Sequence, residues 1–530
     1  MKRCRIRRAR AARAARRTQL LGFIDRPRSA RVRCARRLLL VALVAPADHR
    51  SLRWTWDRGI PGKSWPSMFS IAESWTSLFA DQGYHPAVGL RAIAMLWVFW
   101  FHAVTTACFD SLAIDESGFG PPGSSVGARL QAWWWPLGPS MAGDAGVDLF
   151  LVLSGFLLGG LLLRELSSDG QVHAVRFYVR RWFRIVPAYA TTMVVQVLIL
   201  ANDRQPTACP TLWWSNLMFM NNVWPVQNLY MGPACMVHTW SIAVEFQCYL
   251  ITPPLMVLGH VISKRCALDS TSCYLVVLGV AWLGCVGLRA LSWNPASHTS
   301  QPYTATALRC GPYFAGMALA VALRQQASEP WSFPGPRLRA AGAAASWFIL
   351  LLMAAIGAEP SYFVQRTEPG VYYITNLVFL NQLHAAIGRP LLGLAVAYLL
   401  GMALSGHAAC LAAFLSQRAW RPVAALSYSL YLLQYVGAEA WLPLSSAFIK
   451  PRIDVHDLSA KNIFLAAGIS HAKFPVMLLA TAPLALAQYL VVERPLQLYG
   501  RTVGTKLSEW STRCCCATAE ASSSNKGVLV

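Results

Sequence analysis

The chain has 530 residues, of which 55% are hydrophobic and 13% are charged. These proportions exclude an ordinary soluble protein and favour one that crosses a membrane several times. The formal net charge of +23 requires no nucleic acid partner, because residues 1–50 alone hold fifteen Arg and one Lys against two Asp. The smaller excess of basic residues after position 50 is typical of a membrane protein with positively charged cytosolic loops.

Residues 1–75 form a basic leader rich in Arg and Ala, with no apolar run long enough to span a bilayer. This composition fits an organellar transit peptide, a basic disordered arm or a start placed too early, and the sequence leaves the three alternatives open. We expect residues 76–500 to form a membrane domain and residues 501–530 a C-terminal tail.

Ten apolar runs in the membrane domain are long enough to cross a bilayer as helices. They lie near residues 88–109, 146–164, 185–202, 239–262, 273–293, 304–324, 338–357, 386–405, 422–442 and 474–493. The fold is therefore predicted to be an all-α bundle of about ten transmembrane helices. Because Arg and Lys concentrate in alternate connections, these connections and both termini are predicted to be cytosolic. The membrane is an endomembrane, the plasma membrane or an organelle envelope.

The first apolar run contains two ionisable residues, Arg91 and His102. Eleven residues make almost three full helical turns, so both side chains lie on one face, roughly 16 Å apart along the axis. Ionisable side chains at membrane depth normally face a bundle interior or a wet cavity, which makes both residues candidates for a functional site. The alternative is that Arg91 reaches the interface and His102 bonds a neighbouring helix.

The second apolar run combines Asp148 and Ser154 with four glycines, Gly146, Gly155, Gly159 and Gly160. Small residues allow helices to approach closely, so the glycines are expected to serve packing. Asp148 is a candidate site residue, unless it meets headgroups and water at the edge of the span.

A basic stretch precedes the third apolar run, and we expect it to be a loop. It contains Arg176, Arg180, Arg181 and Arg184, and Pro187 follows early in the span. On a helix, the spacing of the last three arginines gives one cationic patch. This patch is either an anchor to anionic lipid or a clamp for phosphate groups, which guanidinium forks bind in a bidentate manner.

Three further features concern an acid inside an apolar run, a possible disulfide and the end of the last apolar run. Glu245 lies in the fourth run, seven residues after His238, and a carboxylate inside a span requires a partner or a proton. Cys209 and Cys235 share a predicted non-cytosolic loop and are candidates for a disulfide. The last run is expected to end at Glu493 and Arg494, ahead of a proline.

Seven strings, taken in order, resemble the acyltransferase family 3 membrane proteins, and most closely their eukaryotic branch called nose resistant to fluoxetine. The strings are LRAIAMLWVFWFH, GVDLFLVLSGFLL, FYVRRWFRIVPAY, HTWSIAVEFQCYL, GPYFAGMALA, LSYSLYLLQY and LVVERP. The resemblance covers about residues 85–500. It implies an integral membrane enzyme that moves an acyl group from acyl-CoA to a hydroxyl of a sugar, lipid or other small acceptor. Two positions depart from the bacterial pattern: Phe246 replaces a common second acid, and Gln434 replaces a common His.

This resemblance predicts direct acyl transfer. His102 is expected to act as general base on the acceptor hydroxyl. Glu245, or alternatively Asp148, is expected to orient the imidazole. The cytosolic donor is expected to bind through Arg91 and through three arginines of the basic stretch, Arg180, Arg181 and Arg184.

Two alternatives remain open. One is a transporter or lipid-handling protein that uses the same polar helix faces, and the other is a catalytically inactive homologue. No metal site is predicted, because no cluster of ligands has recognisable spacing.

Overall fold

The computed structural model describes eleven parts of the chain. They are residues 69–80, 85–111, 138–200, 209–224, 235–266, 269–292, 301–328, 335–356, 378–444, 447 and 459–524. The chain divides into two units, one of residues Pro66–Arg501 and one of Met1–Trp65 with Thr502–Val530. The predicted leader therefore lies almost entirely outside the described residues.

The described part of the larger unit is helical and contains no strand, which confirms the all-α class. Its long helices are α5 (His85–Ser111), α7 (Ala145–Ser168), α8 (Ala174–Leu200), α10 (Trp240–Cys266), α11 (Ser270–Ser292), α14 (Gly311–Ser328), α15 (Pro336–Ile356), α16 (Val378–Leu404), α18 (Trp420–Ala438) and α20 (Ala460–Gln488). Shorter ones are α4 (Ile71–Ser77), η1 (Gly138–Ala142), α9 (Cys209–Leu217), η2 (Val237–Thr239), α12 (Gln301–Thr304), α13 (Thr306–Arg309), α17 (Ala409–Leu415) and α19 (Trp441–Leu444).

Each of the ten predicted apolar runs overlaps one of the long helices. Within the described residues, seven helical stretches are both long and apolar enough to cross a membrane. The chain is thus a multi-pass membrane protein, while the total of about ten spans and the cytosolic termini stay predictions.

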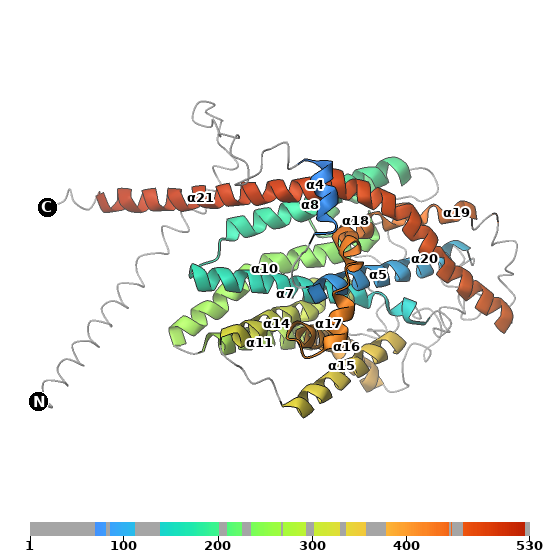
Figure 1. Ribbon diagram of the computed structural model, residues 1–530, viewed down its shortest axis with the longest axis horizontal. Helices are drawn as coiled ribbons and strands as arrows, with labels where there is room; N and C mark the ends of the chain where they lie inside the picture. The colour runs from blue at the N-terminus through green and yellow to red at the C-terminus, as the bar shows by residue number, and fades with distance from the viewer. Residues whose placement is uncertain are drawn as a thin grey trace, which may run out of the picture. The chain divides into compact units, whose positions relative to one another are not determined.

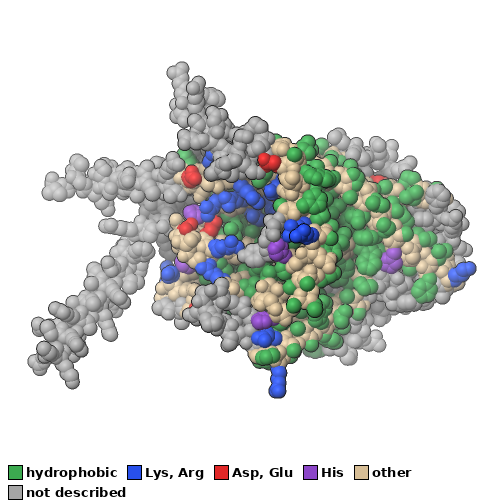
Figure 2. All heavy atoms as spheres, in the orientation of Figure 1, with side chains coloured by type: hydrophobic (Ala, Val, Ile, Leu, Met, Phe, Trp, Pro, Cys, Tyr) green, Lys and Arg blue, Asp and Glu red, His purple; other side chains and the backbone are tan. Residues whose placement is uncertain are grey.

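Helix α7 is the central helix of the bundle. It packs against α5, α10, α14 and α16, and 78% of its apolar window is buried. Figure 1 shows α7, α10, α11 and α14 running side by side. In contrast, only 11% of the corresponding window in α15 is buried, and Leu291 of α11 is 85% exposed. The exposed apolar faces of α11 and α15 therefore suit contact with lipid. One face of the molecule in Figure 2 is broadly hydrophobic, with Lys and Arg side chains gathered beside it.

Glycines bring the backbones of α7 and α14 into direct contact. A Cβ atom on Gly155 would lie 2.0 Å from the backbone oxygen of Tyr313, and one on Gly316 would lie 2.0 Å from that of Val152. The other α7 glycines vary, since Gly146 also meets a backbone oxygen whereas Gly160 has only an ordinary contact. Close helix packing by small residues is confirmed for Gly155 and Gly146.

Replacement of Gly155 by leucine is expected to destabilise the protein by about 3 kcal/mol or more, because the new side chain must displace the backbone of α14. Gly284→Leu is the matched control, since a Cβ there meets nothing within 4 Å. The measurement is the thermal midpoint of each detergent-solubilised variant, and equal midpoints for both variants would contradict the packing argument.

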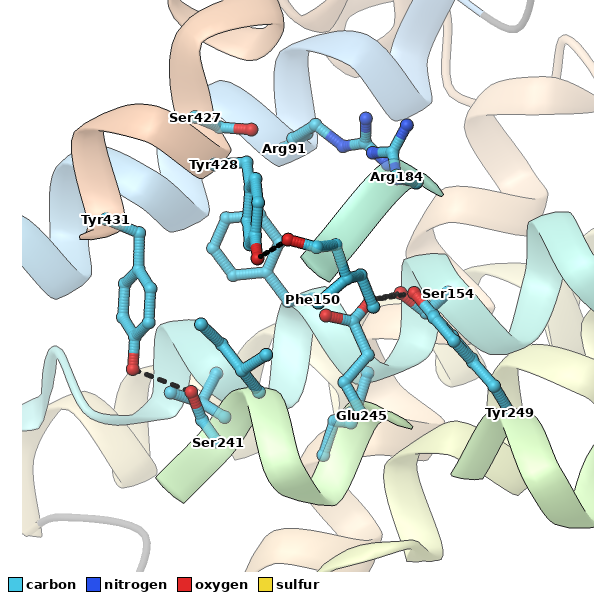
Figure 3. A pocket seen from close by; sticks show the side chains of 14 residues that line it. Arg91, Phe150, Ser154, Arg184, Ser241, Glu245, Tyr249, Ser427, Tyr428 and Tyr431 are labelled. Carbon is cyan, nitrogen blue, oxygen red and sulfur yellow. Dashed lines mark hydrogen bonds between the residues drawn. The ribbon is translucent and has the colours of Figure 1, made fainter. Parts of the chain in front are cut away.

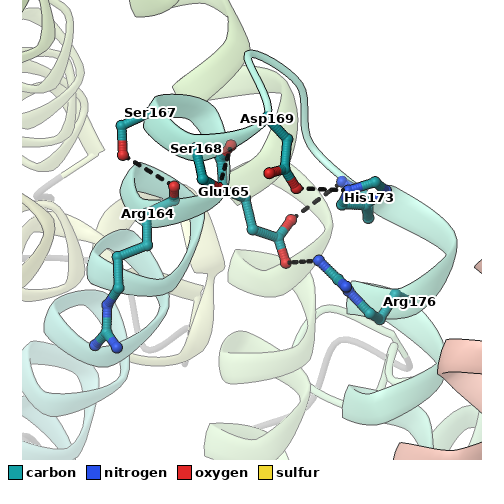
Figure 4. A network of polar contacts seen from close by, with 7 residues as sticks. All are labelled: Arg164, Glu165, Ser167, Ser168, Asp169, His173 and Arg176. Atoms are coloured by element: carbon teal, nitrogen blue, oxygen red, sulfur yellow. Dashed lines mark hydrogen bonds and ion pairs between the residues drawn. The ribbon is translucent and has the colours of Figure 1, made fainter.

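Helix α8 begins earlier than the sequence suggested. The basic stretch forms its first turns and is not a loop, so Pro187 lies in the middle of the helix. The turn from α7 to α8 is fixed by Glu165, which accepts hydrogen bonds from Arg176 Nη2 at 2.7 Å and from the backbone N–H of His173 at 3.1 Å (Figure 4). Hydrogen bonds from Ser168 and His173 lower the pKa of Asp169 in the same turn. This network sets the direction in which the arginines of α8 enter the bundle.

The last predicted span also continues further than expected. The helical backbone passes from α20 through a π-helical turn, η5 (Tyr489–Glu493), into α21 (Arg494–Ser524). Proline is tolerated in the first turn of a helix, and the π turn interrupts the regular hydrogen bonding just before Pro495. The expectation that the helix ends at Glu493 is therefore wrong.

Cys235 is buried and takes part in a disulfide. The side chain of Cys209 lies outside the described residues, so the pairing of the two stays a prediction.

Candidate functional site

A pocket lies among five helices of the larger unit. Its polar lining includes Arg91 from α5, Ser154 from α7, Arg184 from α8, Glu245 from α10 and Tyr428 from α18 (Figure 3). The pocket thus gathers three of the residues predicted from separate strings of the sequence. It is the part of the described structure in which they meet.

The carboxylate of Glu245 is held in place by two hydroxyl groups. Ser154 Oγ donates to Glu245 Oε1 at 2.6 Å, and the hydroxyl of Tyr249, one turn along the same helix, donates to the same oxygen. Hydrogen bonds from hydroxyl groups to a carboxylate are short and directional. The two hydroxyl groups therefore fix the orientation of the Glu245 side chain at the pocket.

Arg91 and Arg184 supply two positive charges at one end of the pocket. Both side chains are half-buried, and their guanidinium groups lie close together in Figure 3. Among the described residues, neither forms a hydrogen bond or an ion pair within 4.0 Å, although Arg91 interacts electrostatically with Glu245 and Glu493. Two neighbouring guanidinium groups without direct partners are suited to bind an anion, and phosphate in particular.

The other two arginines of the predicted clamp differ from Arg184. The guanidinium of Arg181 lies 6.0 Å from the ring centre of Tyr249, directly behind the pocket wall. Arg180 does not line the pocket, and its electrostatic neighbours include Arg176, Glu165 and Arg501. The single cationic patch expected from the spacing is therefore divided, with only part of it at the pocket.

Part of the pocket lining is apolar. It includes Val147, Phe150 and Leu151 of α7 and Ile242 of α10. A site with a largely apolar lining and a few polar groups is typical of a site for a ligand with a charged head and an apolar or neutral arm.

His102 lies on the same face of α5 as Arg91 but does not line the pocket. Its Nδ1 is 3.0 Å from Oε1 of Gln434 on α18, and its ring packs against Tyr435 with centroids 5.5 Å apart. Among the described residues, neither Glu245 nor Asp148 hydrogen-bonds the imidazole. In the place expected for a carboxylate, the structure has the side-chain amide of Gln434, while the catalytic roles of Glu245 and Asp148 stay predictions.

A row of rings connects the pocket to His102. Tyr431 lines the pocket and meets the ring of His238 at 5.5 Å, and His238 packs on Tyr435 at 4.7 Å. Tyr435 then contacts His102 on its other side. These ring contacts link the lining of the pocket to the surroundings of His102.

Asp148 belongs to a different cluster and is itself fully buried. It accepts a hydrogen bond from Arg389 Nη1 at 2.6 Å, and Arg309 Nη2 lies 3.4 Å from its other oxygen. Arg389 also pairs with Asp144, and both guanidinium groups lie over the ring of Tyr303. The two acids and two arginines of this cluster balance in formal charge. Because they come from α7, α13 and α16, their contacts join these helices, and none of the four lines the pocket.

Gln434 beside His102 and Arg389 beside Asp148 are partners that the sequence did not single out for these roles. Arg389 lies in a long apolar stretch, in the same way as Arg91, and that position was the signal available. Gln434 was visible as a departure from a family pattern. No group of three His, Cys, Asp or Glu that could hold a metal ion occurs in the described parts of the chain.

The chain is similar in sequence to known acyltransferases. Residues 89–487 match the profile of a family described as Acyltransferase domain. Over 188 residues the chain is 30% identical to the peptidoglycan O-acetyltransferase OatA of Listeria monocytogenes. The aligned region covers 34% of this chain and 29% of that protein. Over 190 residues it is 28% identical to the putative peptidoglycan O-acetyltransferase YrhL of Bacillus subtilis, with the same coverage of 34% and 29%.

A putative O-acetyltransferase of Staphylococcus aureus is 30% identical over 123 residues, or 22% of this chain and 20% of that protein. The chain therefore spans less than a third of the length of these relatives. No solved structure matches the chain.

Proposed function

The chain belongs to the acyltransferase family whose profile matches residues 89–487, and from this membership we propose that it is an integral membrane O-acyltransferase. It takes an acyl group from acyl-CoA and transfers it to a hydroxyl of a small acceptor at the membrane. The relatives named as O-acetyltransferases favour an acetyl group or another short acyl group and a sugar acceptor, with a lipid as the alternative acceptor. The seven strings favour the eukaryotic branch called nose resistant to fluoxetine.

The separation of the two polar regions on α5 carries this proposal. The paired guanidinium groups of Arg91 and Arg184 are suited to phosphate, whereas His102 is suited to proton transfer. Eleven residues separate Arg91 from His102, which corresponds to roughly 16 Å along the helix. An acyl-CoA has the matching arrangement, with phosphates at one end and a thioester at the end of a long pantetheine arm.

In the reaction, His102 takes the proton of the acceptor hydroxyl as the oxygen attacks the thioester carbonyl carbon. The carbon–sulfur bond breaks, and the imidazolium returns the proton to the leaving thiolate. Glu245 is held by Ser154 and Tyr249 and serves as the fixed counter-charge that positions the two guanidinium groups. Arg181 adds positive charge behind the pocket wall.

Labelled acyl-CoA turnover in membranes that contain the protein tests the proposal. Short and long acyl-CoAs are supplied, and both lipid and glycan fractions are analysed for the label. A labelled product that appears only with the protein supports an acyltransferase and identifies the acceptor class. Substrate uptake without consumption of any acyl-CoA would instead support a transporter, and neither activity would support an inactive homologue.

Replacement of Arg184 by alanine is expected to raise the donor concentration at half-saturation by about 10- to 100-fold, since a hydrogen bond to a charged group contributes about 1.5–3 kcal/mol. Half-saturation by the acceptor is expected to stay constant. Arg164→Ala is the control, because that side chain is exposed on α7 and lies outside the pocket. An unchanged donor requirement in Arg184→Ala would remove this residue from the clamp.

A further inference from the structure

Gln434 has a contact that decides which nitrogen of His102 carries the proton. Its Oε1 lies 3.0 Å from Nδ1 of the imidazole, and a carbonyl oxygen can only accept a hydrogen bond. Nδ1 is therefore the protonated nitrogen of the neutral ring, and it donates to Gln434. The lone pair is left on Nε2, for which the described residues provide no hydrogen-bond partner.

We infer that Gln434 is a positioning residue that keeps His102 in the tautomer required for general base catalysis. This inference rests on the proposed function, in which Nε2 accepts the proton of the acceptor hydroxyl. While Nε2 carries that proton, Nδ1–H stays bonded to Gln434, and the proton then passes from Nε2 to the leaving thiolate. The amide is neutral, so it fixes the ring without stabilising the imidazolium as a carboxylate does.

Two buried polar atoms beside the imidazole support a bound ligand at this place. Gln434 is fully buried, and its Nε2 has no hydrogen-bond partner in the described structure. The same holds for Nε2 of His238, which is 4% exposed. Buried polar groups are nearly always hydrogen-bonded, so the amide nitrogen of Gln434 and the ring nitrogen of His238 each call for a partner that a polar substrate group can supply.

The groups around His102 come from several elements. Gln434 and Tyr435 face it from α18, His238 faces it from η2, and Asp144 at the start of α7 interacts with it electrostatically. On α20, His471 instead bonds the indole N–H of Trp100. Of the neighbours that act on the imidazole, Asp144 is already committed to Arg389, which leaves the neutral amide as the direct partner.

Two variants separate the positioning role from a structural one. Gln434→Leu removes the acceptor and is expected to lower kcat by about 10- to 100-fold at constant donor half-saturation, because the ring can now adopt the other tautomer. Gln434→Glu keeps the acceptor but adds a negative charge, which favours the imidazolium. The acidic limb of its pH–rate profile is therefore expected to move to higher pH by about one unit or more.

A second measurement does not depend on turnover. Diethyl pyrocarbonate modifies the neutral imidazole, so the rate at which His102 is modified at each pH, followed by peptide mass spectrometry, reports its titration. In Gln434→Glu this titration is expected to shift upward together with the activity profile. A shift in the modification profile without turnover in any variant would overturn the proposed function but support the pairing of Gln434 with His102.

Two outcomes would overturn the positioning role of Gln434. If the wild-type protein turns over acyl-CoA, if Gln434→Leu keeps its kcat, and if Gln434→Glu shifts neither profile, Gln434 has no positioning role. Loss of activity in Gln434→Glu without a shift in the modification profile would also overturn the inference, because it would mean that the amide N–H group, and not the carbonyl, faces the imidazole.

Discussion

Replacement of His102 by alanine is expected to lower acyl transfer by about 10²- to 10⁴-fold, the range that a positioned general base contributes. The protein is expected to remain folded, because the imidazole makes one side-chain hydrogen bond, to Gln434, and is half-buried. The measurement is the initial rate of labelled acyl transfer at equal abundance of the variant and the wild-type protein.

His471→Ala is the matched control for this variant. His471 lies on α20 and packs against Trp100 of the same helix that carries His102, at 5.5 Å between ring centres. It has no place in the proposed reaction, so its loss should leave the rate within a factor of a few. Activity that survives in His102→Ala would exclude this residue as the base, while equal losses in both variants would indicate a general disturbance of α5.

The helical periodicity of α5 was sufficient to predict which side chains face the bundle. Arg91 and His102 were expected on one face, and the structure places Arg91 at the pocket and His102 against α18. What the helix faces depends on which helix packs there, and this is a property of the tertiary fold. The partner of His102 lies 332 positions away in sequence, so no local pattern could identify it.

The same limit applies to the neighbours of Glu245. Its place in a span correctly indicated a carboxylate that needs partners. These partners are Ser154, 91 positions earlier, and Tyr249, one helical turn later. Only the second was within reach of a pattern in the sequence, because residues four apart on a helix are neighbours.

The bounds of α8 were missed for a physical reason as well. A criterion of continuous apolar residues ends a helix where arginines begin, although arginine is a good helix former. In the structure the first turns of α8 carry four arginines. One of them, Arg176, forms an ion pair with Glu165 near the end of α7. Long basic side chains can extend from a membrane helix to the polar interface. The helix can therefore extend beyond the end of the apolar run.

Replacement of Arg389 by methionine is expected to destabilise the protein by about 3–5 kcal/mol, the usual effect of removing one partner from a buried ion pair. Arg389 is fully buried and bonds both Asp144 and Asp148. Its loss leaves the buried carboxylate of Asp148 with Arg309 at 3.4 Å, and it removes the ion-pair partner of the largely buried Asp144. Methionine retains much of the side-chain volume, which limits the contribution of a cavity. The measurement is unfolding in detergent by titration with sodium dodecyl sulfate.

Arg418→Met provides the control, because Arg418 is exposed at the turn before α18 and an exposed substitution changes stability by about 0.5 kcal/mol or less. A second variant, Arg389→Met combined with Asp144→Asn, separates charge from packing. If uncompensated charge causes the instability, the double variant is expected to recover part of it, since one buried carboxylate becomes neutral. If it recovers nothing, the loss comes from packing around Tyr303, over whose ring the Arg389 guanidinium lies at 5.1 Å. Equal unfolding curves for Arg389→Met and Arg418→Met would show that the cluster does not hold α7 to α16.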